Sequence, residues 1–361
     1  MTYWQDLLSE HPHTCHSDGH IQFSNPSTPA AGQPTPKERS TQLIPRTDLA
    51  VLRASGGDWR KMLQGQTTCD LTELSAERSV PGALCTPKGR MIANFRLMQD
   101  GDDVLLITPR STETLLLDAL RKFAPFFKVT LEPVELPLLA TLTHAGSSAA
   151  VIAALADSSA SAEPGANEPG VNQVLPWQYG QLMVISEHQL WVTMDQPGAA
   201  AWHSLTALAA LSDTSAATLA DIRDGLAWVT AATSDEFIPQ MLALHRTGAV
   251  NFKKGCYTGQ EVVARMQYLG KLKRQLYRLA LQLEQCEEAP AAGTPCYLPG
   301  ARQNCGHVVM SAAVSDSAAE ALVVLTEEGA ASTSLCFGSD GAETAVSPLP
   351  LPLPELPETT A

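Results

Sequence analysis

The pattern of apolar residues changes near residue 273, and this change limits the folds that the chain can adopt. Before it, strand-like apolar runs alternate with helical patterns such as "TETLLLDALRKFA", in which Leu116, Leu120 and Phe123 share one face. After it, strand-like runs separated by turns predominate, as in "RQLYRLALQL", "GHVVMS" and "ALVVLTE". The sequence therefore predicts a mixed α+β part followed by a small all-β C-terminal domain.

The length of 361 residues exceeds what one hydrophobic core normally supports, so we expect two or three domains. A first mixed unit begins near "DLAVLRASGGDW", where Asp58 is the expected N-cap of a helix, and continues in the hairpin pattern "ALCTPKGRMIANFRLM". A second unit begins near "LPLLATLTHAGSSAAVIAALA" and is interrupted by a low-complexity loop near residues 156–172. Beyond the loop, "QLMVISEHQLWVTM" predicts two strands and "AAAWHSLTALAAL" predicts a helix.

Both ends of the chain lack the apolar periodicity of folded elements. Residues 1–42 are rich in Pro, Ser and Gly and are predicted to form a disordered extension, and residues 347–361 a Pro-rich extended tail. Several residues of the N-terminal part could hold a metal, but their spacing matches no recognised site, so no metal site is predicted. They are His11, His13, Cys15, His16 and His20.

Composition narrows the class of protein. Hydrophobic residues make up 44% and charged residues 17%, as in globular chains. The segment "MTYWQDLLSEHPH" has no features of a secretory signal, and no run of 18 apolar residues is present, so we expect a cytoplasmic protein without membrane contact. The eight cysteines form no C-x-x-C pair, and most are expected to be free thiols.

Positive charge is concentrated in residues 246–278, which contain eight Lys and Arg residues and a single acidic residue, Glu261. This segment carries +7, although the whole chain carries −14. The overall charge argues against direct binding of nucleic acid. The local charge suggests an anionic small ligand or a locally docked anionic partner, and a solvated basic face is the alternative.

The basic segment contains "NFKKGCYTGQE", residues 251–261. Gly255 and Gly259 predict a tight loop whose main chain can approach a ligand closely. The following "QEVVARMQYLGKL" predicts a helix, with apolar residues at helical spacing. These are Val262, Val263 and Met266.

Cys256 is thus expected just ahead of a helix N-terminus, close to Lys253 and Lys254. A helix N-terminus and neighbouring ammonium groups both favour the thiolate, which is the reactive form of cysteine. The alternative is a buried Cys256 that fills a glycine-rich turn.

The segment "KKGCYTGQEVVAR", with "FIPQ" at 237–240 and "LQGQTTCDL" at 63–71, resembles the YgfZ family of folate-binding proteins, relatives of the glycine-cleavage T-protein, an aminomethyltransferase. The family signature K-G-C-Y-x-G-Q-E is matched at every fixed position from Lys254 to Glu261. Weaker agreement, including "PKGR" and "DIRDG", covers about residues 43–345.

The resemblance implies a three-domain T-protein-like cloverleaf with ferredoxin-like domains and a C-terminal β-barrel. The first, folate-binding domain would comprise residues 43–135 and 218–270, the second, ferredoxin-like domain residues 136–217, and the barrel residues 271–346. The family binds tetrahydrofolate and supports the assembly or repair of iron–sulfur proteins, including tRNA-thiolating enzymes. These two are the cofactor and the partners that the resemblance implies.

The resemblance also assigns roles to residues. Cys256 corresponds to the key functional cysteine of the family, and Asp70 to the catalytic acid of the T-protein, where it could act as an acid or base or simply cap a helix. Residues expected to contact the folate come mainly from the signature. They are Lys253, Lys254, Gly255, Tyr257, Gly259, Gln260, Glu261, Gln66 and Arg223. Arg223 has a structural ion pair as its alternative.

Two tryptophans that family members often use to contact folate correspond to positions near Leu49 and Ala217. Trp59, Trp202 and Trp228 are candidates to replace them in space. Three functions stay open: a folate-dependent accessory factor for iron–sulfur proteins, a one-carbon transferase of the T-protein kind, and a non-catalytic folate-responsive docking module.

Overall fold

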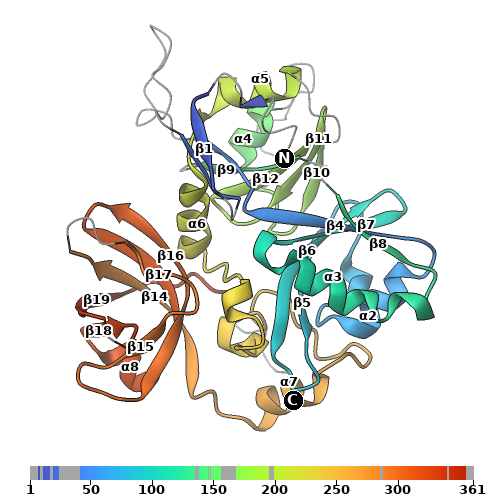
Figure 1. Ribbon diagram of the computed structural model, residues 1–361. Coiled ribbons are helices and arrows are strands. Elements are labelled where there is room, and N and C mark those ends of the chain that lie inside the picture. The colour runs from blue at the N-terminus through green and yellow to red at the C-terminus, as the bar shows by residue number, and fades with distance from the viewer. Residues whose placement is uncertain are drawn as a thin grey trace, which may run out of the picture.

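The computed structural model describes residues 7–8, 11–16, 19–23, 41–134, 138–144, 146, 148–155, 168–194, 199–284, 288–339 and 341–354. Figure 1 shows three domains around a common centre, with a six-stranded sheet at the top, a five-stranded sheet at the right and a closed barrel at the left. The predicted α+β class with a C-terminal barrel is thereby confirmed.

The first domain is built on an antiparallel five-stranded sheet, covered by two helices through apolar side chains such as Met62 and Leu120. Its strands follow the order β5 (Val80–Cys85), β6 (Met91–Asp100), β7 (Asp103–Pro109), β4 (Leu49–Ser55) and β8 (Thr130–Val134). The helices are α2 (Trp59–Gln66) and α3 (Glu113–Arg121), with short turns η1 (Leu71–Glu73), η2 (Arg110–Thr112) and η3 (Ala124–Phe126). Asp58 precedes α2 as predicted, but its carboxylate accepts from the Lys128 N–H at 3.2 Å instead of capping the helix.

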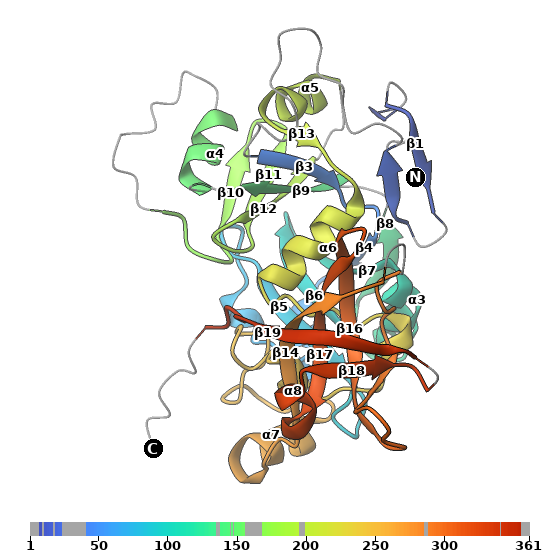
Figure 2. The same ribbon diagram turned by 90° about the vertical axis from the view of Figure 1, so that its left-hand side faces the viewer.

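The second domain carries α4 (Ser148–Leu155) and α5 (Ala199–Leu208), which share one apolar cluster with the six-stranded sheet. The strand order is β10 (Val174–Trp177), β11 (Gly180–Val184), β12 (Gln189–Met194), β9 (Leu138–His144), β3 (Thr41–Pro45) and β13 (Ala210–Leu211). Helix α6 (Thr214–Arg223) contacts both β3 and the barrel strand β16, so it joins the second domain to the third (Figure 2).

The barrel closes in the order β14 (Arg274–Gln282), β17 (Ala318–Thr326), β16 (Asn304–Ser315), β15 (Pro295–Tyr297), β18 (Ser334–Phe337) and β19 (Glu343–Leu349), with α8 (Glu327–Ala331) after β17. Alternate residues such as Leu279, Leu281, Val308 and Val323 are buried in its own apolar cluster, which explains the strand-only pattern after residue 273.

A late segment of the chain returns to the first domain. It contains η4 (Ala231–Thr233), η5 (Pro239–Leu242) and α7 (Gln260–Leu269). The Met91 N–H donates to the Phe237 carbonyl at 2.8 Å, and the Asn251 N–H donates to the Thr68 carbonyl at 2.9 Å. These bonds attach the segment that bears the signature to the first domain, at the start of β6 and at the turn that follows α2.

Three observations differ from the sequence-based expectations. Within residues 1–42, β1 (His13–Cys15) pairs with β2 (Ile21–Phe23), and Ile21 is buried in the core of the second domain. Strand β3 also belongs to the second domain, although the boundary was expected at residue 136. At the other end, β19 extends into the predicted tail and closes the barrel. Most of the predicted loop near 156–172 lies outside the described residues.

Candidate functional site

The signature loop, defined here as residues 251–259, turns against the hairpin between β5 and β6. Gly259 has φ +83°, and a Cβ on it would lie 2.4 Å from the Thr86 carbonyl oxygen and 3.0 Å from Gly89 Cα. Glycine is therefore required at position 259 both by conformation and by space. Glycine is not required at position 255 on either ground, contrary to the prediction. No atom lies within 4 Å of a Cβ built there, and the φ of Gly255 is outside the left-handed region.

The Lys254 side chain points into the protein and not toward a ligand. Its Nζ donates to three backbone carbonyls, those of Gln64 at 2.7 Å, Thr67 at 2.8 Å and Cys69 at 2.6 Å. An ammonium group has three N–H donors, so all of them are used. The carbonyls lie in and just after the last turn of α2, where a helix leaves acceptors without intrahelical partners. Burial lowers the pKa of Lys254, although the nearby Asp70 opposes the shift.

Asn251 connects the start of the signature loop to Asp70. Its Oδ1 accepts from the backbone N–H groups of Lys253 at 2.7 Å and Lys254 at 2.9 Å, which fixes the turn. Its Nδ2 donates to Asp70 Oδ2 at 3.3 Å. Asn251 was not predicted as a site residue from the sequence, although an Asn at the start of a loop is a known signal for such a turn.

Asp70 is held by local hydrogen bonds. Its Oδ1 accepts from Gln64 Nε2 at 3.0 Å, from the Thr72 N–H at 3.0 Å and from Thr72 Oγ1 at 2.9 Å. Burial alone would raise the pKa of Asp70, but these hydrogen bonds and the Lys254 ammonium outweigh it and lower the pKa. The carboxylate thus caps η1, which was one of its two predicted roles. A group with a lowered pKa is a poor general acid near neutral pH.

Cys256 is exposed and free, two residues after the buried Lys254. It precedes α7 by four residues, so the predicted position ahead of a helix is confirmed. Lys253 and Glu261 are exposed as well, whereas Tyr257 is buried with its hydroxyl unpartnered among the described residues. Burial raises the pKa of Tyr257.

The remaining glutamines of the signature region hold the loop from both sides. Gln66 Oε1 accepts from Thr258 Oγ1 at 2.9 Å, and the Gln260 N–H begins α7 by donating to the Tyr257 carbonyl at 3.2 Å. From "FIPQ", Gln240 Nε2 donates to the Val263 carbonyl at 2.6 Å inside α7. The motifs noted separately in the sequence therefore form one bonded unit, in which Lys254 and Tyr257 are buried while Lys253, Cys256 and Glu261 are exposed.

A second feature of the structure is a cavity of about 670 Å³ where the three domains meet. Its wall is mostly apolar and includes Leu49, Pro109, Trp228, Val309 and many alanines. No lining residue comes from the signature loop. Figure 1 agrees, since α7 lies at the lower end of the first domain and the start of β4 lies at the junction above. The volume is typical of small-molecule sites.

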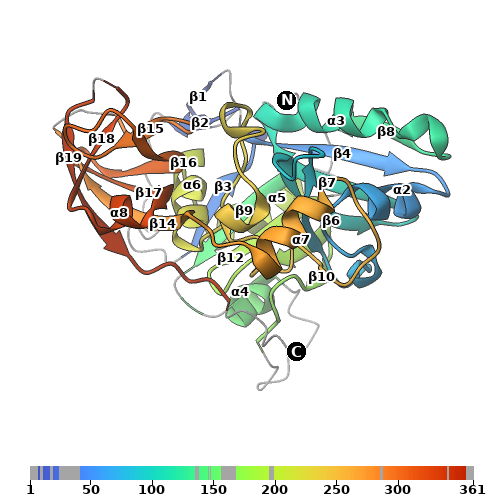
Figure 3. The same cartoon turned by 90° about the horizontal axis from the view of Figure 1, so that it is seen from below.

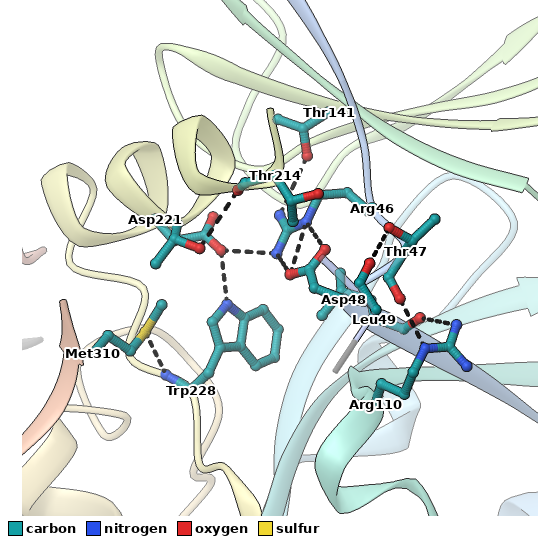
Figure 4. A network of polar contacts seen from close by, with 12 residues as sticks. Arg46, Thr47, Asp48, Leu49, Arg110, Thr141, Thr214, Asp221, Trp228 and Met310 are labelled. Atoms are coloured by element: carbon teal, nitrogen blue, oxygen red, sulfur yellow. Dashed lines mark hydrogen bonds and ion pairs between the residues drawn. The ribbon is translucent and has the colours of Figure 1, made fainter. Parts of the chain in front are cut away.

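The polar side of this cavity is a network around Arg46 (Figure 4). Arg46 Nη2 contacts Asp48 Oδ2 at 2.9 Å and Asp221 Oδ2 at 3.0 Å. Asp221 is fully buried, and it also accepts from Trp228 Nε1 at 3.0 Å. Burial raises the pKa of Asp221, although the Arg46 guanidinium opposes the shift.

Trp228 is held at one face of its ring and at its edge. Its ring stacks on Trp191 with a centroid separation of 6.1 Å and an angle of 18°, and Arg46 lies 5.5 Å from the Trp191 ring centroid. Leu49, one position expected to carry a family tryptophan, lines the same cavity, and Ala217 is buried on α6 beside it. Among the three candidate replacements, Trp228 therefore lies in the cavity, whereas Trp59 and Trp202 belong to the cores of the first and second domains.

Arg223 is placed away from this cavity. Its Nε and Nη2 donate to Glu320 Oε1 of β17 at 3.1 and 2.8 Å, and Arg278 contacts the other oxygen of Glu320 at 2.7 Å. The structural ion pair foreseen for Arg223 is thus present. Its neighbour Asp224 accepts from Gln189 Nε2 at 2.8 Å.

No group of three or more His, Cys, Asp or Glu side chains in the part of the chain that the structure describes could hold a metal ion. Over the same residues, no helix is both long and apolar enough to cross a membrane.

Sequence reasoning missed the Arg46 network entirely. Arg46, Asp48 and Asp221 are charged residues, which are normally exposed, and no spacing rule announces that the three are buried together. The one relevant feature of the sequence is "RTD", residues 46–48, just before an apolar strand. Its burial could be recognised only from the structure, in which it connects β3 of the second domain to β4 of the first.

Comparison with known proteins places this architecture. No family model matches the chain. The chain is 34% identical over 334 residues to the tRNA-modifying protein YgfZ of Yersinia pestis (strain Pestoides F), which covers 91% of this chain and 98% of the relative. It is also 34% identical to the Shigella sonnei protein of the same name, over 71% of this chain and 77% of that protein.

The fold has a solved counterpart. The crystal structure of the glycine cleavage system aminomethyltransferase T from Bartonella henselae superposes with a TM-score of 0.65 over 87% of this chain and 86% of that one, at 17% identity. This likeness shows the T-protein-like fold. The sequence identity to the curated relatives shows the family. The chain belongs to the YgfZ family of tRNA-modifying proteins.

Proposed function

We propose that this protein is a folate-binding accessory factor that supports the assembly or repair of iron–sulfur proteins, among them tRNA-modifying enzymes. The observation that carries the proposal is the division of the signature loop into a buried Lys254 and an exposed Cys256. A purely structural cysteine would be packed inside, as Cys69 and Cys85 are. A loop that is anchored so firmly and yet presents a thiol to solvent suits contact with a second macromolecule.

The cavity at the domain junction fits the proposed tetrahydrofolate. A pterin is a flat ring, and the fixed Trp228 indole offers an apolar face, with the Asp221 carboxylate at its edge. The volume of about 670 Å³ is adequate for such a ligand. When bound, the folate would supply the one-carbon or redox chemistry of a reduced pterin, and Trp228 would orient it. The anionic glutamyl tail would need a cation that is not already bound within the protein. Lys254 does not meet this need, because its ammonium donates to backbone carbonyls such as that of Cys69.

The transferase alternative receives less support. It needs Asp70 beside the folate, but Asp70 is not among the residues that line the cavity, and its oxygens accept bonds from Gln64, Thr72 and Asn251. We therefore assign Asp70 to the scaffold of the signature loop. Release of methylenetetrahydrofolate from a glycine-derived donor by the purified protein would reverse this assignment.

The test is complementation with Cys256→Ser in a bacterial strain that lacks its own family member. The measured quantity is the thiolated nucleoside content of tRNA, a product of an iron–sulfur enzyme. We expect the wild type to restore it and Cys256→Ser to restore less than a tenth. Cys15→Ser is the matched control, because Cys15 is also exposed but lies in the N-terminal hairpin. Full restoration by Cys256→Ser would refute the role of the thiol.

A further inference from the structure

Helix α7 directs an unusual set of side chains to solvent. Val263 is the buried residue of this helix, while Val262, Tyr268 and Leu269 are 37%, 62% and 84% exposed. At 100° per residue, these three lie within one third of the helix circumference, together with Arg265 and the exposed Glu261. Large apolar residues gathered on one exposed face are a mark of an interaction surface.

This face continues into the loop that carries the exposed thiol. The Phe252 and Tyr268 rings meet edge to face with centroids 6.0 Å apart, which joins the beginning of the signature loop to the end of α7. Lys253 and Cys256 are exposed on that loop. Figure 3, seen from below, shows α7 facing the viewer between the barrel and the five-stranded sheet. We call Lys253, Glu261, Val262, Arg265, Tyr268, Leu269, Lys271 and Lys273 the α7 face.

The positive charge of the α7 face comes from those cations of residues 246–278 that do not bind other parts of this chain. Lys254 binds carbonyls of the first domain, Arg274 binds Asn304, and Arg278 binds Glu320. Arg246 donates to the carbonyls of Leu353 and Pro354. The other four cations of the segment are exposed, and none of their side chains has a hydrogen-bond or ion-pair partner among the described residues: Lys253, Arg265, Lys271 and Lys273. Lys271 and Lys273 line a surface pocket with Glu327 and Glu328 of the barrel.

We propose that the α7 face docks an acidic protein, whose carboxylates surround an apolar contact and which is thereby placed next to Cys256. This proposal deepens the proposed function, on which it rests, by naming the surface that receives a client protein. Four exposed cations and one exposed carboxylate, Glu261, give the α7 face a net charge of +3, and this charge beside the exposed Tyr268 and Leu269 matches a partner with a carboxylate rim and an apolar centre. Exposed aliphatic side chains gain nothing from phosphate groups, and the chain as a whole carries −14, so a protein is favoured over RNA.

The first test uses the complementation assay described above. Lys271→Glu with Lys273→Glu reverses the charge of the face, and Tyr268→Ser with Leu269→Ser removes its apolar contact. We expect each pair to lower thiolated tRNA at least five-fold, with tetrahydrofolate affinity unchanged. Lys61→Glu with Lys122→Glu is the matched control on the α2 and α3 side of the first domain, and Phe126→Ser, at 80% exposed, controls for the apolar change. Full activity of both α7 pairs would overturn the proposal.

The second test does not depend on the proposed function. A photoreactive benzoylphenylalanine replaces Leu269 or, as control, Phe126, and the adducts formed in living cells are identified by mass spectrometry. We expect an acidic protein that is attached at position 269, absent at 126, and lost when Lys271 and Lys273 are changed to Glu. RNA adducts, self-adducts of this chain, or adducts that survive the charge reversal would each refute the proposal. If the wild type failed to restore tRNA thiolation, the proposed function would be refuted. The crosslinking assay would still test whether the α7 face binds an acidic protein.

Discussion

Lys254 and Cys256 lie two residues apart in one loop, yet the Lys254 ammonium is enclosed by three backbone carbonyls while the Cys256 side chain is exposed. The lysine of the signature therefore acts on the cysteine through the backbone, by fixing the loop, and not as a cation offered to a ligand. In sequence, the signature resembles a basic loop that binds a ligand. In the structure, its lysine holds the loop to the first domain and its cysteine is exposed to solvent.

Replacement of Lys254 by Met should destabilise the protein by about 3 kcal/mol, because three carbonyls at the end of α2 lose a charged donor and stay buried. Urea unfolding followed by circular dichroism measures this change. Lys253→Met is the matched control, since Lys253 is exposed, and it should change the free energy of unfolding by no more than about 0.5 kcal/mol. Equal stabilities for the two variants would contradict the anchoring role.

The two glycines of the loop should respond very differently to alanine. Gly259→Ala combines a left-handed φ of +83° with a Cβ 2.4 Å from the Thr86 oxygen, so we expect a loss of about 3 kcal/mol or more and a displaced α7. Gly255→Ala meets open space and should be tolerated within about 0.5 kcal/mol. Thermal unfolding of both variants decides this, and a tolerated Gly259→Ala would show that the loop can move away from the hairpin.

The elements with a regular apolar period could be predicted from sequence. The β5–β6 hairpin, α3, the β11–β12 pair and α7 all lie where their patterns placed them. Each is a local element, either a helix or two strands joined by a short turn, so its pattern is contained in one stretch of sequence. Helix α7 shows the limit of this reasoning. Val262, Val263 and Met266 share a helical stripe, but the helix rests on the domain by a narrow edge, so only Val263 is fully buried.

Features that join residues far apart in the chain could not be predicted in this way. Strand β3 pairs with β9, nearly 100 residues later, and the N-terminal hairpin is held by bonds such as that from the Ile21 N–H to Thr214 Oγ1 at 3.0 Å. The buried pair of Arg46 and Asp221 is 175 residues apart in sequence. No local pattern reports such partners, because the energy of a buried ion pair depends on burial that the fold creates.

The folate site proposed in the cavity predicts that tetrahydrofolate affinity depends on Trp228. Trp228→Leu keeps the site apolar but removes the aromatic face, and we expect the Kd for tetrahydrofolate to rise at least ten-fold, equivalent to about 1.4 kcal/mol. Calorimetric titration under reducing conditions measures the change. Trp202→Leu is the control, because Trp202 is equally buried but packs in the core of the second domain. Unchanged affinity in Trp228→Leu would move the folate site elsewhere.

The link between α6 and the barrel should weaken in acid through Glu320. Burial alone would raise the pKa of Glu320, but the hydrogen bonds from Arg223 and Arg278 outweigh it and lower the pKa below the ordinary 4.5. A carboxylate whose folded-state pKa is lowered stabilises the protein above its unfolded-state pKa, and this contribution is lost as the pH falls through the lowered folded value.

At pH 7 we therefore expect Glu320→Gln to cost about 2 kcal/mol, because two charge-assisted pairs are lost. Below pH 4 the wild type should lose this advantage progressively, so that the two unfolding curves converge. Chemical unfolding of both proteins between pH 7 and pH 3 measures the difference, with Glu288→Gln, an exposed glutamate, as the control. A gap that stays constant down to pH 3 would show that the wild-type advantage comes from packing of the side chain and not from its charge.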